Sequence, residues 1–284
     1  MDLASIGVIL AVIVELLEMA NTLSAVPPLP SYKNPPVIEV SFGTIFSPLS
    51  EMQTRHFGQF WTEHKSDYPK TKDLGPLLDL SRLGPHGISM DVPPLRRMMC
   101  FSDDEKYVAQ VQDSRLHLNW RKIPISSEYP RYPVVSAKFQ KLWKDFGAFA
   151  DREGIGPLSV IRYELVYVNH VELGLGSSIA DLLEEYVKLF CFSPIQAAYL
   201  SPPESVNTTW NFAMPEQRGT ATASLSNATN KEGQNLLVLV FTCNGAPSEK
   251  HDMVDWFQSA HEWIVRSFTE LTTDDAHQKW GRER

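Results

Sequence analysis

Titratable side chains gather on one face of a predicted β-strand. The stretch VIRYELVYVNHVEL, residues 160–173, alternates as a strand does, and residues two apart in a strand share a face. One face carries Arg162, Glu164, His170 and Glu172. The other face is largely apolar, so we expect it to pack against helices. The polar face either lines a pocket or meets water, and both alternatives stay open.

Arg162 and Glu164 are the first candidates for a functional site. They could line a cavity between two halves of the molecule, or form an ion pair on a wet sheet face, which contributes under about 1 kcal/mol. Glu39 lies in the corresponding strand of an earlier part of the chain. If Glu39 and Glu164 face each other across a pseudo-twofold axis, repulsion raises the pKa of one carboxyl. That pair could then act in acid–base catalysis.

Metal and cofactor chemistry finds little support in the sequence. His170 and Glu172 could supply two metal ligands, but a third ligand is missing nearby. The three cysteines, Cys100, Cys191 and Cys243, lie far apart without metal-ligand spacing, which favours buried thiols in a reducing cytoplasm. The chain also lacks a Gly-x-Ser-x-Gly motif and a glycine-rich phosphate loop. We therefore predict no metal site and no cofactor.

A basic and aromatic cluster occupies residues 115–132. Its members are Arg115, Trp120, Arg121, Lys122, Tyr129, Arg131 and Tyr132. Such residues are common anchors of protein interfaces, and aromatic rings interleaved with arginine can also stack on single-stranded bases. Ordinary packing is a third interpretation. The candidate binding residues are Trp120, Arg121, Arg131, Tyr132, Arg162, Glu164, Tyr167 and His170.

The overall charge argues against one class of partner. The chain has 284 residues, of which 43% are hydrophobic, and a formal net charge of −8. This composition is ordinary for a globular protein with a sizeable core. An acidic chain without a basic block gives no electrostatic reason to expect nucleic-acid binding.

Hydrophobic periodicity predicts the elements that position these residues. Strand patterns occur at 37–46, 96–102, 107–113, 115–121, 160–173, 208–215, 219–227 and 235–245. Helical spacing occurs at 49–64, at 128–154, at 177–190 and from about 248 to 268. Ser50 is the expected cap of the first helix, and a loop with several glycines and prolines follows that helix to Pro94. Thr272 or Thr273 should cap a short final helix whose Trp280 packs back on the body.

The predicted order β-α-β-β-β-α occurs twice, in residues 34–156 and 157–284. We therefore expect an α+β fold in which two pseudo-repeated halves share a curved, largely antiparallel sheet. The TATA-binding-protein-like and gyrase-inhibitor-like folds are analogies for this order. Strand 160–173 should lie centrally beside strand 37–46, with the face of Arg162 and Glu164 toward a concave cleft.

Residues 1–33 are predicted to form a separate apolar segment and a proline-rich tether. The apolar run is interrupted by Glu15 and Glu18, which argues against a spanning helix, and no Lys or Arg precedes Lys33, which argues against a secretory signal. An amphipathic helix or extension, a signal or anchor, and an upstream mis-start of the gene remain as alternatives. We expect a cytoplasmic protein, with membrane association through residues 3–19 as the minor alternative.

Several stretches together resemble a sporadically distributed bacterial family without an assigned activity. They are NPPVIEV, LNWRK, YPRY, YELVYVNHVE and LTTDDAHQKWGR, in that order from about residue 34 to the C-terminus. The resemblance implies no substrate, cofactor or catalytic residue. A scattered distribution fits horizontally moved genes, such as those of defence or conflict islands.

Three functions remain as hypotheses from the sequence. The first is a non-catalytic binding protein that recognises a protein partner or a small ligand in a concave cleft between the two halves. The second is a small-molecule enzyme that uses Glu39 and Glu164 as acid and base. The third is a single-stranded nucleic-acid binder. The oligomeric state is left open.

Overall fold

The computed structural model describes residues 27–77, 95–123, 128–172, 183, 185–188, 204–230 and 233–284. Residues 1–26, Cys191 and most of the helix expected at 177–190 lie outside the described residues.

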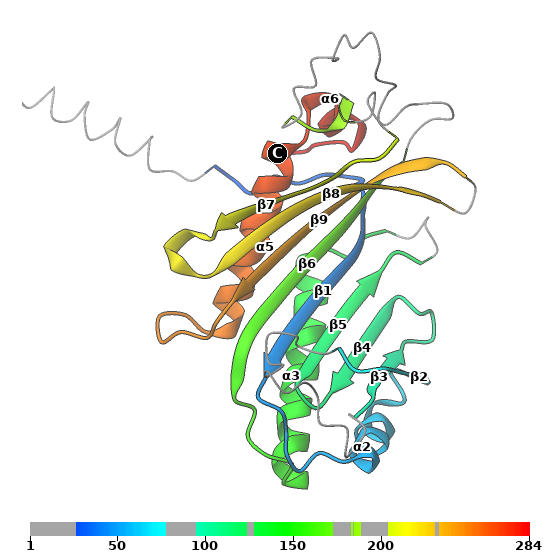
Figure 1. Cartoon of the computed structure of the whole chain (residues 1–284), viewed down its shortest axis with the longest axis vertical. Helices are drawn as coiled ribbons and strands as arrows, with labels where there is room; N and C mark the ends of the chain where they lie inside the picture. The colour runs from blue at the N-terminus through cyan, green and yellow to red at the C-terminus, as the bar shows by residue number, and fades with distance from the viewer. Residues whose placement is uncertain are drawn as a thin grey trace, which may run out of the picture.

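Nine strands of the described residues form one antiparallel sheet (Figure 1). Their order is β2-β3-β4-β5-β1-β6-β9-β8-β7, so β1 and β6 pair in the middle, as expected. The strands are β1 (Val37–Phe46), β2 (Lys70–Leu74), β3 (Arg97–Phe101), β4 (Tyr107–Gln112), β5 (Arg115–Arg121), β6 (Val160–Glu172), β7 (Asn207–Ala213), β8 (Thr220–Thr229) and β9 (Asn235–Gly245). An α+β fold with a large antiparallel sheet is thereby confirmed. The internal repeat and the two fold analogies stay predictions.

The edge strand β2 was not expected from the sequence, which predicts a loop there. Its sequence KTKDL is short and charged, and it lacks the apolar alternation by which a strand is recognised. Short, charged edge strands are a common way to discourage further strand pairing. The pairing with β3, from Lys70 opposite Phe101 to Leu74 opposite Arg97, is the only signal that defines it.

Two long helices, α3 (Tyr132–Glu153) and α5 (Met253–Leu271), cover one face of the sheet (Figure 1). The side chain of Phe42 on β1 lies between them, with ring centroids 5.5 Å from Phe139 of α3 and 5.1 Å from Phe257 of α5. The helices thus share one apolar core, although they belong to different predicted halves. The remaining helical elements are α2 (Thr54–His64), the 3-10 turn η2 (Pro215–Gln217) and α6 (Asp274–Lys279).

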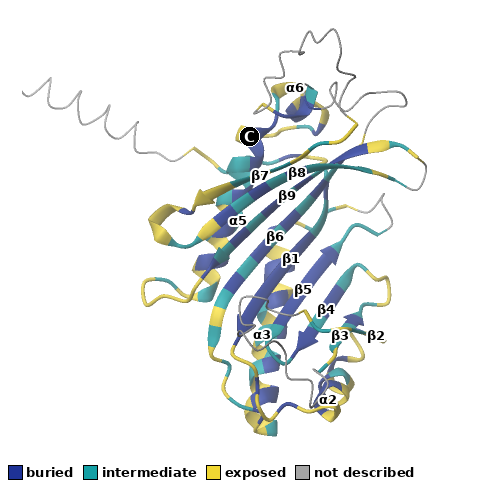
Figure 2. Ribbon diagram, in the orientation of Figure 1, coloured by how far each residue is buried: buried dark blue, intermediate teal, exposed yellow. Residues whose placement is uncertain are grey.

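The second face of the sheet, which we call the open face, is lined by the alternate residues of each strand. Along β6, buried residues alternate with partly exposed ones, as the alternating colours in Figure 2 show. Tyr163, Leu165 and Tyr167 are buried on the helix-covered face. Arg162 and Glu164 therefore point to the open face.

The described part of the proline-rich tether, residues 27–33, is packed against the fold. Tyr32 is only 4% exposed, and its hydroxyl lies 2.8 Å from Thr269 Oγ1. The backbone of residues 31–34 pairs with that of residues 280–283 near the C-terminus. The predicted boundary between residues 33 and 34 therefore falls inside a paired segment.

Among the described residues, no helix combines the length and the apolar character needed to cross a membrane.

Candidate functional site

The candidate residues from the sequence lie on two different faces of the sheet. Glu39, Arg121, Arg162, Glu164 and His170 lie on the open face, because they alternate with the residues that pack on the helices. Trp120 and Tyr167 lie on the helix-covered face, beside Arg131 and Tyr132 at the start of α3. The residues expected to line a single cleft are thus divided between the two faces of the sheet.

The two candidate glutamates are not neighbours. On the pairing of β1 with β6, Glu39 lies opposite Val168 and Glu164 lies opposite Gly43. A separation of four residues along a strand is roughly 13 Å. Asn119 Nδ2 donates to Glu39 Oε1 at 2.5 Å, so this carboxylate already has a partner. The geometry gives no support to a glutamate pair acting as acid and base.

Arg162 and Glu164 share a face, but in the described part of the chain no ion pair joins them. Burial raises the pKa of Glu164, and the nearby charges of Arg162 and Arg115 oppose that increase. His170 lies toward the far end of β6, where burial lowers its pKa. No group of three or more His, Cys, Asp or Glu side chains among the described residues could hold a metal ion.

A cavity of about 360 Å³ lies on the helix-covered face, between elements of both predicted halves. Its volume falls within the range of small-molecule sites. It is lined by Leu29, Pro30, Ser31, Tyr32, Pro35, Val37, Tyr129, Arg131, Tyr132, Pro133, Tyr167, Asn169, His261, Ile264, Val265, Phe268 and Arg284. Most of these side chains are apolar or aromatic, and only a few polar groups could orient a bound molecule.

Three side chains of the wall form a hydrogen-bonded relay. The hydroxyl of Tyr167 lies 3.1 Å from the hydroxyl of Tyr129 and 2.9 Å from Nδ1 of His261. The ring of Tyr132 stacks on the imidazole of His261, with centroids 4.0 Å apart and planes 9° from parallel. The relay crosses from the segment before α3, through β6, to α5.

All members of this relay are uncharged at neutral pH. Burial lowers the pKa of His261 to about 4, because the charged imidazolium would lose its hydration. Burial also raises the pKa of Tyr129 and of Tyr167, and it raises that of Tyr132 to about 12. An imidazole with so low a pKa is a weak base near pH 7. The relay is therefore suited to hydrogen bonding with a neutral group rather than to proton abstraction.

Arg131 secures another wall of the cavity. Its Nη1 donates to the carbonyl oxygen of Tyr32 at 2.8 Å, and its Nη2 donates to that of Lys33 at 3.3 Å. The backbone of Arg131 has φ = 73°, which costs a non-glycine residue about 1–3 kcal/mol. The surrounding packing must offset this strain, and the two hydrogen bonds hold Tyr32 and Lys33 against the start of α3. Arg131 acts on this segment rather than on a ligand directly.

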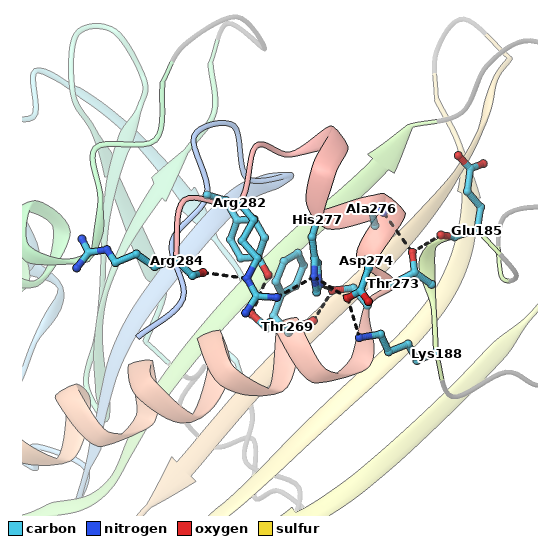
Figure 3. Close-up of polar contacts among 12 residues, drawn as sticks. Glu185, Lys188, Thr269, Thr273, Asp274, Ala276, His277, Arg282 and Arg284 are labelled. Atoms are coloured by element: carbon cyan, nitrogen blue, oxygen red, sulfur yellow. Dashed lines mark hydrogen bonds and ion pairs between the residues drawn. The ribbon is translucent and has the colours of Figure 1, made fainter. Parts of the chain in front are cut away.

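His277 and Asp274 of α6 lie close together (Figure 3), and with Thr272 they have the residue types of a catalytic triad. Thr272 Oγ1 lies 2.9 Å from His277 Nε2, and Asp274 Oδ1 lies 3.5 Å from His277 Nδ1. Thr272, however, is 1% exposed, and its hydroxyl donates to the carbonyl oxygen of Phe268. A nucleophile must reach its substrate, so we interpret this arrangement as the contact that holds α6 on α5.

The sequence alone did not indicate His261 or the tether as parts of a site. His261 flanks the apolar stripe of α5, which is the usual pattern of a structural histidine. Tyr32 and Pro35 lie in a segment that resembles a linker by composition. The available signal was the aromatic content of both regions, but it does not specify which aromatic residues meet.

No family model, curated protein or solved structure matches the chain. The family resemblance stated from the motifs therefore stays a prediction.

Proposed function

We propose that the chain is a non-catalytic binding protein whose ligand is a small molecule held in the cavity between α5, β6 and the tether. The observation that carries this proposal is the pair of hydroxyls, on Tyr129 and Tyr167, that joins His261 in the wall of a cavity of about 360 Å³. A concave, mostly apolar site with a few convergent polar groups is the usual form of a small-molecule site.

The chemistry of the wall defines the class of ligand. Ile264, Val265 and Phe268 supply apolar surface from α5. Tyr167 and His261 supply neutral hydrogen-bonding groups, and the guanidinium of Arg131 is engaged by backbone carbonyls. A largely apolar molecule with one uncharged polar group, such as a carbonyl or hydroxyl, matches these features.

The fluorescent ketone Prodan belongs to this class and can serve as the probe. Val265 lines the cavity and is partly exposed, whereas Val254 is on the same helix, outside the lining, and 42% exposed. Val265→Trp should fill the cavity and abolish saturable Prodan fluorescence, while Val254→Trp should leave the titration unchanged. Equal Prodan affinity in both variants, or no saturable binding to the wild type, would refute the proposal.

A protein partner is the other form of the binding hypothesis, and the open face is the surface available to it. The buried relay favours the small ligand, because Tyr167 is only 6% exposed and a large protein surface cannot easily reach its hydroxyl.

Cys100 and Cys243 are buried free thiols whose pKa is raised to about 12 by burial. Inert buried thiols support the cytoplasmic location expected from the sequence.

We also infer that the two halves arose by duplication, in the manner of the TATA-binding-protein-like and gyrase-inhibitor-like analogies. The strand order supports this inference, because β5, β4 and β3 follow β1 outward as β9, β8 and β7 follow β6. The test is an experimental structure in which β1, β5 and α3 superpose on β6, β9 and α5. A mismatch in strand direction or helix position would reject the duplication.

A further inference from the structure

Asn169 is a polar side chain in the largely apolar wall of the cavity. It lies on the helix-covered face of β6, where its neighbours on that face, Tyr167 and Val171, are buried. Asn169 is itself only 4% exposed, and it lines the cavity. Asparagine is uncommon in strands, and an apolar residue would fill the same place at lower cost. The presence of an amide here therefore calls for an explanation.

Backbone pairing brings Asn169 to the cavity. The register of β1 on β6 shifts between Val37 and Glu39, and Asn169 lies opposite Val37, which also lines the cavity. Next to this shift, the backbone N–H of His170 donates to the carbonyl oxygen of Pro36 at 3.0 Å. Irregular pairing of this kind is frequent beside functional sites, because it redirects side chains. Asn169 is thus held at the cavity by two central strands rather than by a loop.

One hydrogen bond determines the orientation of the Asn169 amide. Its Nδ2 donates to the backbone carbonyl oxygen of Leu239 at 3.1 Å. A carbonyl oxygen can only accept, so the amide atom that faces it must be the nitrogen. The other amide atom, Oδ1, has no hydrogen-bond partner among the described residues and is not fully enclosed by protein atoms. Asn169 therefore offers a fixed hydrogen-bond acceptor to a molecule in the cavity.

The relay in the same wall offers a hydrogen-bond donor. The hydroxyl of Tyr167 has one proton and two partners, the hydroxyl of Tyr129 and Nδ1 of His261. If this proton points to His261, the neutral imidazole carries its own proton on Nε2. If it points to Tyr129, the hydroxyl proton of Tyr129 is left over. Neither group has a further hydrogen bond within the described part of the chain, so the relay ends in one available N–H or O–H in both cases.

We propose that the ligand of this cavity is an apolar alcohol or phenol, whose hydroxyl donates to Oδ1 of Asn169 and accepts from the relay. This inference rests on the proposed function, because it narrows the class of ligand for the same cavity. Tyr167 and Asn169 lie on one face of β6, about 7 Å apart along the strand, so the donor and the acceptor belong to one region of the wall. A ketone or an ether can only accept, and it would leave Oδ1 of Asn169 without a partner. Asn169 is thereby the residue that determines specificity.

Displacement of Prodan from the full chain by two matched compounds tests this specificity. The alcohol 1-tetralol and the ketone 1-tetralone share a carbon skeleton and differ only in the oxygen group. We expect 1-tetralol to displace half of the Prodan at a concentration about tenfold below that of 1-tetralone, because an unmet buried acceptor lowers affinity by this order. Asn169→Leu removes the acceptor and should bring the two concentrations to within about twofold. The ratio is measured within one protein, so a change in Prodan affinity cancels.

Asn211→Leu is the matched control, because Asn211 lies on β7 outside the cavity lining and its Oδ1 accepts from Thr222 Oγ1 at 3.0 Å. The control should keep the wild-type preference for 1-tetralol. Asn169→Val replaces Asn169→Leu if the latter fails to fold. Saturable Prodan binding without a preference for 1-tetralol in the wild type, or with the same preference in the Asn169 variant, would overturn this inference and leave the proposed function standing. No saturable Prodan binding to the wild type would overturn both.

Discussion

Gly43 determines the shape of the open face at the scale of single residues. Its missing Cβ makes room for the ring of His117, whose pKa is lowered by burial and by the charges of Arg115, Arg97 and Arg162. The strand alternation predicted that Arg162 and Glu164 share a face. The alternation could not predict that Arg97 and His117 lie on the same face, because the pairing of strands from distant parts of the chain places them there. Trp120 and Arg121 were assigned to one cluster because they are adjacent in sequence. They lie on opposite faces of the sheet, since adjacent residues of a strand point in opposite directions.

Gly43→Ala should destabilise the fold by about 1–3 kcal/mol, because the new methyl group overlaps the buried His117 ring. Urea unfolding measures this change. Gly43→Ala should cost less stability in the His117→Ala background than in the wild type, because the obstructing ring is then absent. Additive effects of the two substitutions would show that the ring is not the obstacle.

Tyr167→Phe should lower the free energy of unfolding by about 1–3 kcal/mol, because it leaves Tyr129 and His261 with an unmet hydrogen bond in a buried place. Tyr163→Phe on the same strand is the control, because the hydroxyl of Tyr163 makes no hydrogen bond within the described part of the chain. The control should change stability by less than about 0.5 kcal/mol. Equal effects of both substitutions in urea unfolding would contradict the relay.

At the scale of elements, helices were predictable where their apolar stripe is long. The stripe of α3 buries Val135, Phe139 and Phe146, as its spacing indicates. Thr273 caps α6 and Trp280 packs on Phe268, again as expected. The predicted start of α2 is wrong, because the cap is Gln53 and not Ser50. Gln53 and His56 contact each other reciprocally, and the backbone N–H of Gln53 donates to Nδ1 of His56 at 3.0 Å. Such reciprocal contacts depend on tertiary placement as much as on propensity.

Asp252→Ala should destabilise the protein by about 1 kcal/mol, because Asp252 caps α5 by accepting a hydrogen bond from the backbone of Asp255. Asp252→Asn preserves an acceptor at the cap and should retain most of the stability. Thermal unfolding of the three proteins compares them. A loss as large in the asparagine variant as in the alanine variant would assign the effect to charge rather than to capping.

At the scale of the whole molecule, two segments that are far apart in the sequence are joined. Residues 31–34 pair with residues 280–283, and Arg131 holds the same segment from the start of α3. Composition predicted a tether here because prolines dominate it, and the pairing could not be predicted because it joins segments about 250 residues apart. The cavity depends on this closure, since Leu29, Pro30 and Tyr32 form part of its wall.

The stability of the whole molecule should fall as the pH falls from 7 to 5. Burial holds the pKa of His117 at about 3 and that of His261 at about 4 in the folded state, against an ordinary value of 6.5. Between these values the unfolded state binds more protons, so acid favours unfolding. Each histidine should contribute a loss of about 2 kcal/mol over this range.

Urea unfolding of the wild type and of His117→Gln at pH 7, 6 and 5 measures this dependence. The variant should lose stability less steeply, because one buried titrating group has been removed. Parallel profiles for the two proteins would contradict a neutral, buried His117.

The central claim is that the cavity between α5, β6 and the tether holds a small molecule. Native mass spectrometry of the full chain, purified from its own host cells under mild conditions, tests it most directly. We predict a discrete mass increase, released on denaturation, in the wild type and in Val254→Trp but not in Val265→Trp. The bare mass of the chain in the wild type, or the same adduct in folded Val265→Trp, would contradict the account.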